Sequence, residues 1–162
     1  MLLSNSTAAL FVADIDVSKA FYEQVLGMEV EFDFGGNVIY TSGFAIWAIA
    51  DDHVIRQQLG AEAIRCSVCN RFELYFETED LQQVYDALKA HEVRFMHEPL
   101  TESWGQQTVR FFDPDGHLIE VGESMHRFVN RLHGEGLTIA QLVTLTHVPQ
   151  AEVERLLGRV SG

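Results

Sequence analysis

Apolar positions follow the same order of periods in two stretches of the chain. Each stretch begins with a short alternating run, passes an aspartate into a run with helical spacing, and ends in a second alternating run. The stretches cover residues 10–30 and 74–95, with Asp14 and Asp80 at the equivalent point of each. The pattern predicts one supersecondary unit present twice, and repeated units of this kind usually pack against each other.

Further apolar runs complete both units. The first unit is expected to continue with strands over residues 28–34, 38–41 and 44–50, separated by glycine-containing turns. The second is expected to contain a strand, a helix and three strands over residues 72–78, 80–91, 93–97, 108–112 and 118–122. An Asp-Pro-Asp-Gly sequence at residues 113–116 has the composition of a hairpin turn. Between the units lies a polar connector in which residues 54–59 suit a short helix.

The last part of the chain has helical periodicity only. Helices are predicted over residues 126–133, 138–146 and 150–157, with Thr138 as a cap and Pro149 as a first-turn proline. The last two have the order of a helix-turn-helix, which alone would suggest DNA binding by a ligand-sensing regulator.

Charge argues against that function. The final helix carries Glu152 and Glu154 against Arg155, whereas phosphate contacts need lysine and arginine. We expect these helices instead to pack on the preceding domain, to cover a ligand site or to extend a dimer interface, because their apolar stripes are too extensive to face water.

Composition limits the classes of protein further. A chain of 162 residues with 47% hydrophobic residues can bury one good core, so one main domain is expected. The formal net charge of −13 lies in the part before residue 125, which makes nucleic acid an unlikely partner. No apolar run approaches the roughly 20 residues that span a bilayer, and the N-terminus lacks the basic region of a secretion signal. We therefore expect a soluble, cytoplasmic protein without membrane contact.

Two cysteines, Cys66 and Cys69, form a Cys-x-x-Cys pair between the units. A zinc site would need two further ligands, and none stands at a convincing spacing. Ordinary reduced thiols are the expected state.

Two sequences, DIDVSKAFYEQVLG in the first unit and RFFDPDGHLIEVGE in the second, make the chain resemble the vicinal oxygen chelate superfamily. This superfamily includes glyoxalase I, bleomycin-resistance proteins and extradiol dioxygenases. The resemblance implies an α+β domain over residues 1–124, with βαβββ units at about 7–50 and 72–124 that curl into an open barrel. Ligands would bind in its concave cup, and a homodimer is expected. Residues 125–162 would form a helical extension.

The resemblance also implies where a metal would bind. In the metal-dependent lyases and isomerases of the superfamily, each unit supplies one ligand from its first strand and one from its last. Carried over to this chain, these positions are Thr7, Trp47, Glu73 and Glu120. A tryptophan indole is only a donor, and a neutral threonine hydroxyl is a poor ligand. A divalent ion on Glu73 and Glu120 would be weakly held and hydrated, closer to magnesium or manganese behaviour.

Strand alternation places further side chains in the cup. The expected cup-facing residues of the second unit are Glu73, Tyr75, Thr108, Arg110, Phe112 and Glu120. Two carboxylates about 5 Å apart would repel by roughly 3 kcal/mol at an effective dielectric of about 20. Arg110, a shared proton or a metal ion could relieve this repulsion.

Three interpretations of the carboxylate pair follow. Arg110 could join Glu73 and Glu120 in a structural salt-bridge network. The cup could be a metal-free pocket for a polar or cationic small molecule. The carboxylates could hold a metal that supports proton transfer, with Glu120 or Glu73 as ligand and general base.

The sequence thus predicts a protein that binds a small molecule in an acidic, aromatic-lined cup with an incomplete metal site, which includes Thr7 and Trp47. A divalent-metal-dependent lyase or isomerase that uses Glu73 and Glu120, with Glu120 as the catalytic residue, is the first alternative. A ligand-sensing regulator that acts through the C-terminal helices is the second.

Overall fold

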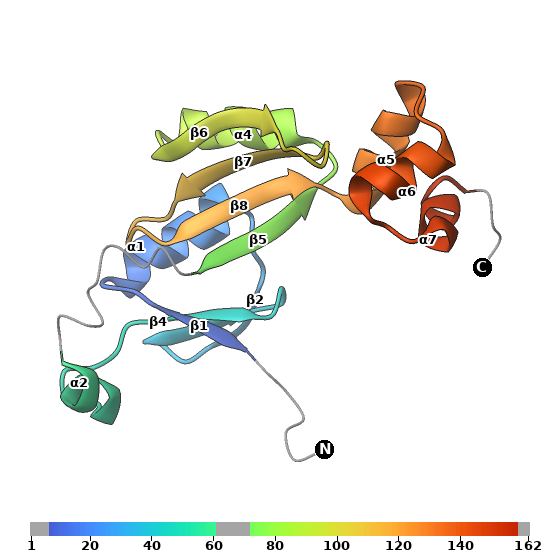
Figure 1. The fold of residues 1–162 in the computed structure, drawn as a ribbon. Coiled ribbons are helices and arrows are strands. Elements are labelled where there is room, and N and C mark those ends of the chain that lie inside the picture. Colours follow the sequence, from blue (N-terminus) through green and yellow to red (C-terminus); the bar gives the residue numbers. More distant parts are fainter. Residues whose placement is uncertain (1–6, 61–71, 159–162) are drawn as a thin grey trace, which may run out of the picture. The chain divides into compact units, whose positions relative to one another are not determined.

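A computed structural model of the chain describes residues 7–60 and 72–158, and it contains two four-stranded sheets and several helices (Figure 1). The first sheet consists of β1 (Ala8–Phe11), β2 (Val30–Asp33), β3 (Asn37–Tyr40) and β4 (Phe44–Trp47). The second consists of β5 (Glu73–Thr78), β6 (Phe95–Thr101), β7 (Gln107–Phe112) and β8 (Leu118–Glu123). The described helices are α1 (Ile15–Lys19), η1 (Ala20–Val25), α2 (Val54–Leu59), α4 (Leu81–Ala90), α5 (Met125–Gly134), α6 (Ile139–Thr146) and α7 (Gln150–Leu156). The predicted strand, helix and three-strand order is confirmed in both repeats.

The chain divides into two compact units. The first contains Met1–Phe72 and Phe112–Leu118, and the second contains Glu73–Phe111 and Ile119–Gly162. The turn between β7 and β8 therefore groups with the first unit, whereas the C-terminal helices group with the second. A domain boundary after residue 124 stays a prediction.

The first sheet has the order β1-β4-β3-β2, with β1 parallel to β4 and the other neighbours antiparallel. Asp14 caps α1 by accepting hydrogen bonds from the amides of Asp16 and Val17. The helix continues into the wider turns of η1, which bring Tyr22 onto the sheet. Its ring contacts those of Tyr40 and Phe44, at centroid distances of 5.8 and 5.2 Å. Tyr22 is fully buried, so it belongs to the core of the first unit.

The second sheet has the order β5-β8-β7-β6 and carries α4 on one face (Figure 1). Behind this helix the core contains the fully buried Val109, Phe111 and Ile119. Along β5, burial alternates as predicted, with Glu73, Tyr75 and Glu77 exposed and the residues between them half-buried. We call the face opposite α4 the open face of the second sheet, and its residues include Glu73, Tyr75, Thr108, Arg110 and Glu120.

β6 differs most from its prediction. The strand was expected over residues 93–97, whereas it runs to Thr101 and passes through Pro99. Because β6 is the edge strand, Pro99 can be accommodated without an interior ladder hydrogen bond. Its register against β7 shifts between His97 and Leu100. The longer strand ends directly before Glu102.

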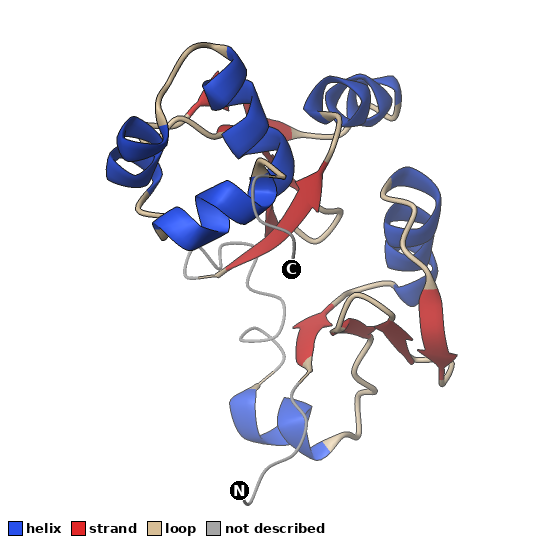
Figure 2. Ribbon diagram, turned by 90° about the vertical axis from the view of Figure 1, so that its right-hand side faces the viewer, coloured by secondary structure: helices blue, strands red, loops and turns tan. Residues whose placement is uncertain are grey.

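The three C-terminal helices pack together around an apolar core of their own (Figure 2). Its buried members are Phe128, Val129, Leu132, Leu142 and Val153. Thr138 forms the predicted cap, with a reciprocal hydrogen bond from its backbone to the Gln141 side chain. Pro149 stands at the cap position of α7, one residue before the first turn in which it was expected.

The remaining predictions concern membrane contact, the cysteine pair, the open barrel and the homodimer. No helix in the described residues is long and apolar enough to cross a membrane. Cys66 and Cys69 lie outside the described residues. None of the described strands forms a closed or curled sheet, so the open barrel stays a prediction, as does the homodimer.

Candidate functional site

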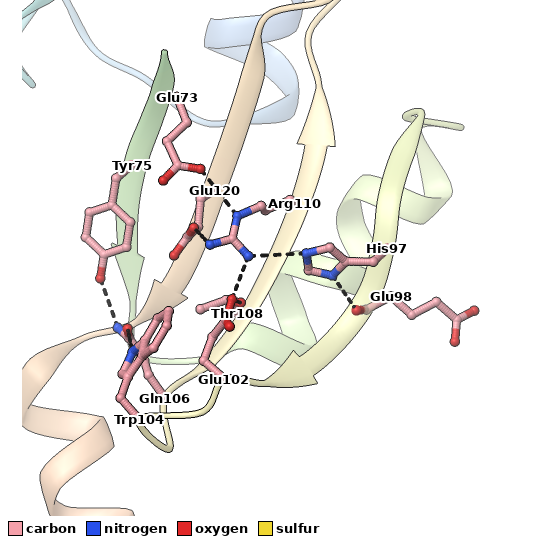
Figure 3. Close-up of polar contacts among 10 residues, drawn as sticks. All are labelled: Glu73, Tyr75, His97, Glu98, Glu102, Trp104, Gln106, Thr108, Arg110 and Glu120. Carbon is pink, nitrogen blue, oxygen red and sulfur yellow. Dashed lines mark hydrogen bonds and ion pairs between the residues drawn. The ribbon is translucent and has the colours of Figure 1, made fainter. Parts of the chain in front are cut away.

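The predicted polar residues of the open face meet at Arg110 on β7. Its Nε lies 3.3 Å from the Glu73 carboxylate, and its Nη2 is paired with Glu120 (Figure 3). Its Nη1 donates to Glu102 over 2.6 Å. Arg110 thus bridges the two glutamates, as the salt-bridge interpretation requires, and a third carboxylate completes the group. We call these four residues the Arg110 cluster.

Two contacts of Arg110 were not selected from the sequence. Glu102 follows β6, and its carboxylate also accepts a hydrogen bond of 3.2 Å from the Thr108 hydroxyl. His97 stands opposite Arg110 in the β6–β7 register, with its Nε2 at 3.4 Å from Nη1. His97 lies within the predicted strand 93–97, where its position opposite β7 could have selected it, whereas Glu102 lies in the turn after β6 and has no such signal.

Electrostatics distinguish the carboxylates. The Glu120 side chain is only 5% exposed, and burial raises the pKa of Glu120 although Arg110 opposes the shift. At Glu102, the hydrogen bond from Arg110 lowers the pKa. One guanidinium faces three carboxylates, so the Arg110 cluster carries an excess of negative charge when its acids are ionised.

An aromatic pair lies beside this cluster. Gln106 donates from Nε2 to the Tyr75 hydroxyl over 3.0 Å, and its Oε1 accepts from the Trp104 indole over 3.1 Å (Figure 3). Tyr75 and Trp104 are 43% and 39% exposed, so both rings remain accessible. Gly122 permits this arrangement, because a Cβ there would lie 2.9 Å from Gln106 Nε2 and 3.1 Å from the Tyr75 hydroxyl.

The remaining predicted residues have separate surroundings. Thr108 is buried and hydrogen-bonded to Glu102. Thr7, Trp47 and Phe112 belong to the first unit. Thr7 is exposed just before β1, and the Trp47 ring contacts those of Phe11 and His53 at 6.2 and 5.0 Å. The membership of Thr7, Trp47 and Phe112 in the ligand site stays a prediction.

The residues present do not fit the metal centre that the resemblance implies. Glu73 and Glu120 both bind the guanidinium of Arg110, so a cation already occupies the position between them. Thr7 and Trp47 cannot supply the missing donors. Among residues 7–60 and 72–158, no three or more histidine, cysteine, aspartate or glutamate side chains are arranged to hold a metal ion.

Two strand, helix and three-strand units with these sheet orders define the class of glyoxalase, bleomycin-resistance and dioxygenase proteins. The chain belongs to the family described as Glyoxalase-like domain, whose model matches residues 6–126. α6 and α7 lie outside the matched residues.

Solved structures agree with this assignment. A protein of unknown function from Agrobacterium tumefaciens strain C58 is 36% identical, with a TM-score of 0.64 over 77% of this chain and 95% of that one. Lactoylglutathione lyase from Agrobacterium tumefaciens is 21% identical, with a TM-score of 0.54 over 75% and 93%. A bleomycin resistance determinant encoded on the transposon Tn5 is 22% identical, with a TM-score of 0.55 over 76% and 99%. The last two share the fold alone. Among curated proteins, none matches the chain.

Proposed function

We propose that this glyoxalase-like protein binds a small molecule with a positively charged group on the open face of the second sheet, without a metal ion. The observation that carries the proposal is the excess of carboxylates around Arg110. The concave cup expected from the resemblance belongs to the proposal, since a curved sheet would enclose a ligand on this face.

The arrangement supports both charge and shape recognition. Arg110 holds three carboxylates in fixed positions without neutralising all of them, so a ligand cation would gain charge-assisted hydrogen bonds. Tyr75 and Trp104 offer accessible aromatic faces beside the carboxylates. An aromatic face attracts a cation that lies within about 6 Å of its centre. A planar cation such as an amidinium or guanidinium group fits this combination.

Titration calorimetry with three ligands of the same size tests the proposal. Benzamidine carries a planar cation, benzamide is its neutral counterpart, and benzoate is an anion. We expect the protein to bind benzamidine, to lose that binding as salt is raised, and to bind neither of the others. Equal binding of benzamidine and benzamide would contradict a charge-selective site.

A pair of variants locates the site. Glu102→Gln removes one carboxylate of the Arg110 cluster and should weaken benzamidine binding about tenfold, the usual effect of one charged hydrogen bond. Glu98→Gln is the matched control, because the Glu98 side chain points away from Arg110 (Figure 3). If both variants weaken binding equally, the effect reflects overall charge and the proposed site is wrong.

The metal-dependent lyase or isomerase is not favoured, because Arg110 lies where Glu73 and Glu120 would share an ion. Benzamidine binding should therefore survive dialysis against a chelator. Metal analysis of protein purified without chelator provides the opposite test: a stoichiometric ion that is lost in Glu120→Gln would favour the enzyme.

The regulator is not favoured either. Arg155 is the basic residue of α7, and its Nε already donates to Glu152 over 2.8 Å. Binding to duplex DNA at low salt would contradict this conclusion.

A further inference from the structure

The turn between β6 and β7 contacts two different parts of the second unit. On one side, Glu102 pairs with Arg110. On the other, the carbonyl of Gly105 accepts a hydrogen bond of 2.7 Å from Nη2 of Arg131, a residue of α5. Five residues, 102–106, thus connect the Arg110 cluster to the C-terminal helices.

Arg131 is held firmly enough to fix this turn. Its Nε and Nη2 form two hydrogen bonds of 2.7 Å with the Glu123 carboxylate. The Glu123 side chain is 4% exposed, and the same carboxylate accepts a hydrogen bond of 2.9 Å from the backbone N–H of Gln107. A two-point arginine–carboxylate pair fixes direction as well as distance. Both the end of the turn and the start of β7 are therefore tied to α5.

Apolar side chains of α5 and α6 pack closely against the same turn. Gly105 has a φ of +95°, and a Cβ there would lie 3.3 Å from Leu145, 3.4 Å from Leu132 and 3.5 Å from Phe128. The backbone of the turn therefore lies directly against side chains of α5 and α6. A glycine is needed here both for the left-handed backbone and for the close approach.

Next to Gly105 stand the residues that would meet a ligand. Trp104 precedes it and donates to Gln106, and Gln106 also donates to the Glu123 carbonyl over 2.7 Å. The position of the Trp104 ring thus depends on Gln106, which is anchored beside the Arg131–Glu123 pair.

We propose that Arg131 is a positioning residue for the ligand site, and that the C-terminal helices act through the β6–β7 turn to place Glu102 and Trp104. This inference rests on the proposed function for its effect on binding. It assigns a role to helices of which α6 and α7 lie beyond the family match at residues 6–126. Arg131 and most of the C-terminal helices thus add to the matched domain a contact that holds the β6–β7 turn.

The test uses the whole 162-residue chain in which Trp47→Phe leaves Trp104 as the fluorescent tryptophan, since the chain has two tryptophans. Arg131→Met removes the contacts with Glu123 and Gly105. Glu135→Gln is the matched control, because Glu135 binds Nη1 of the same arginine on the outer surface, at 3.0 Å and 52% exposed. Only the first variant releases the turn.

Three measurements are compared at a temperature where both variants are folded. In Arg131→Met we expect stronger acrylamide quenching of Trp104, and in carbon-13 NMR a Glu102 carboxyl whose pKa has risen toward its ordinary value. Benzamidine binding should weaken about tenfold, as for one misplaced charged hydrogen bond. Glu135→Gln should leave all three unchanged.

A folded Arg131→Met protein with unchanged quenching and an unchanged Glu102 titration would overturn the inference and leave Arg131 a purely structural residue. If Arg131→Met does not fold, Arg131→Lys gives the same decision, because lysine keeps the positive charge beside Glu123 and cannot form the two-point pair and the Gly105 bond together. The fluorescence and NMR results need no ligand. They therefore still decide the inference if benzamidine fails to bind and the proposed function is wrong.

Discussion

The two sheets have equivalent strand orders and opposite chemistry on the face away from their own helix. In the first sheet, strand register places Phe11, Phe32, Ile39 and Trp47 together on that face. In the second, the corresponding face carries the Arg110 cluster. A duplicated topology therefore preserves the backbone and the helix-side core, whereas the other face is free to change. The function of the chain is to be sought in that difference, since one fold supports many chemistries.

One pair of positions shows the change directly. Trp47 on β4 and Glu120 on β8 stand at equivalent places, each on a strand that pairs with the first strand of its sheet. Trp47 packs against the rings of Phe11 and His53. Glu120 is nearly buried and depends on Arg110. The first sheet gains stability from apolar contacts, while the second must compensate buried charge.

Arg110→Met should have the largest effect on stability. It leaves Glu73, Glu102 and the nearly buried Glu120 without their common cation, and breaking a buried ion pair costs about 3–5 kcal/mol. Urea denaturation at pH 7 measures this loss. It should become smaller at pH 4, where protonation relieves the repulsion among the acids. A loss that is the same at both pH values would show that Arg110 contributes through packing instead.

Lys19→Met is the comparison in the first unit. Lys19 pairs with Asp33, and both side chains are well exposed, at 29% and 38%. Exposed pairs of this kind contribute little because water already solvates both charges. The midpoint of unfolding should hardly move. A loss as large as that of Arg110→Met would remove the contrast between the two units.

Tyr22→Phe should have the second largest effect on stability, after Arg110→Met. The Tyr22 hydroxyl donates to Asp113 over 2.9 Å in a buried contact that ties η1 to the β7–β8 turn. Its loss removes one of the contacts of the buried Asp113 Oδ2, which keeps the contact with His117 Nδ1, at a cost of about 1–3 kcal/mol. Tyr75→Phe should cost less, since Tyr75 is half-exposed and Gln106 keeps its bond to the Glu123 carbonyl. Thermal denaturation of both variants ranks them, and the reverse order would contradict this account.

How far the sequence predicts this fold depends on the regularity of each element. The amphipathic stripe of α4 and the alternation along β5 are confirmed because one periodicity governs each of them. β6 was predicted too short. A proline usually ends a strand, and Pro99 is acceptable within β6 only because β6 lies at the edge of its sheet. That place is a property of the whole sheet and has no local signal.

The same limit applies to the Arg110 cluster. Alternation along single strands was enough to bring Glu73, Arg110 and Glu120 to one face. Glu102 was missed because it lies in a turn, where no periodicity fixes the direction of a side chain. The link from Arg131 to Gly105 joins residues 26 positions apart, and only the packing of α5 against the turn reveals it.

Glu102 and Glu120 should respond to pH in opposite directions although they share one arginine. The pKa of Glu102 is lowered, so its contribution to stability is present above the ordinary carboxyl value of 4.5 and is lost as pH falls. The pKa of Glu120 is raised, so its contribution is present below 4.5 and is lost as pH rises through the folded value. Glu102→Gln should therefore be destabilising by about 1 kcal/mol at pH 7, and the loss should shrink as pH falls below 4.5. The free energy of unfolding of Glu120→Gln should rise relative to that of the wild type between pH 4.5 and 7. Urea midpoints across this range test both, and parallel curves would contradict the assignment.

His117→Asn gives a small effect that depends on pH, and it tests the turn that groups with the first unit. His117 Nδ1 lies 2.7 Å from the Asp113 carboxylate. Burial is the largest single influence and opposes the charged imidazole, but the hydrogen bond to Asp113 together with the negative charges of Asp113 and Asp115 outweighs it, so the pKa of His117 is raised. A raised pKa means that the contribution is full below the ordinary value of 6.5 and is lost as pH rises through the folded value. The free energy of unfolding of the wild type should therefore exceed that of His117→Asn by up to about 1 kcal/mol at pH 5.5 and by less at pH 9. Proton NMR titration of His117 together with urea unfolding checks both statements. A difference that grows with pH would show that the neutral imidazole is the form that Asp113 stabilises.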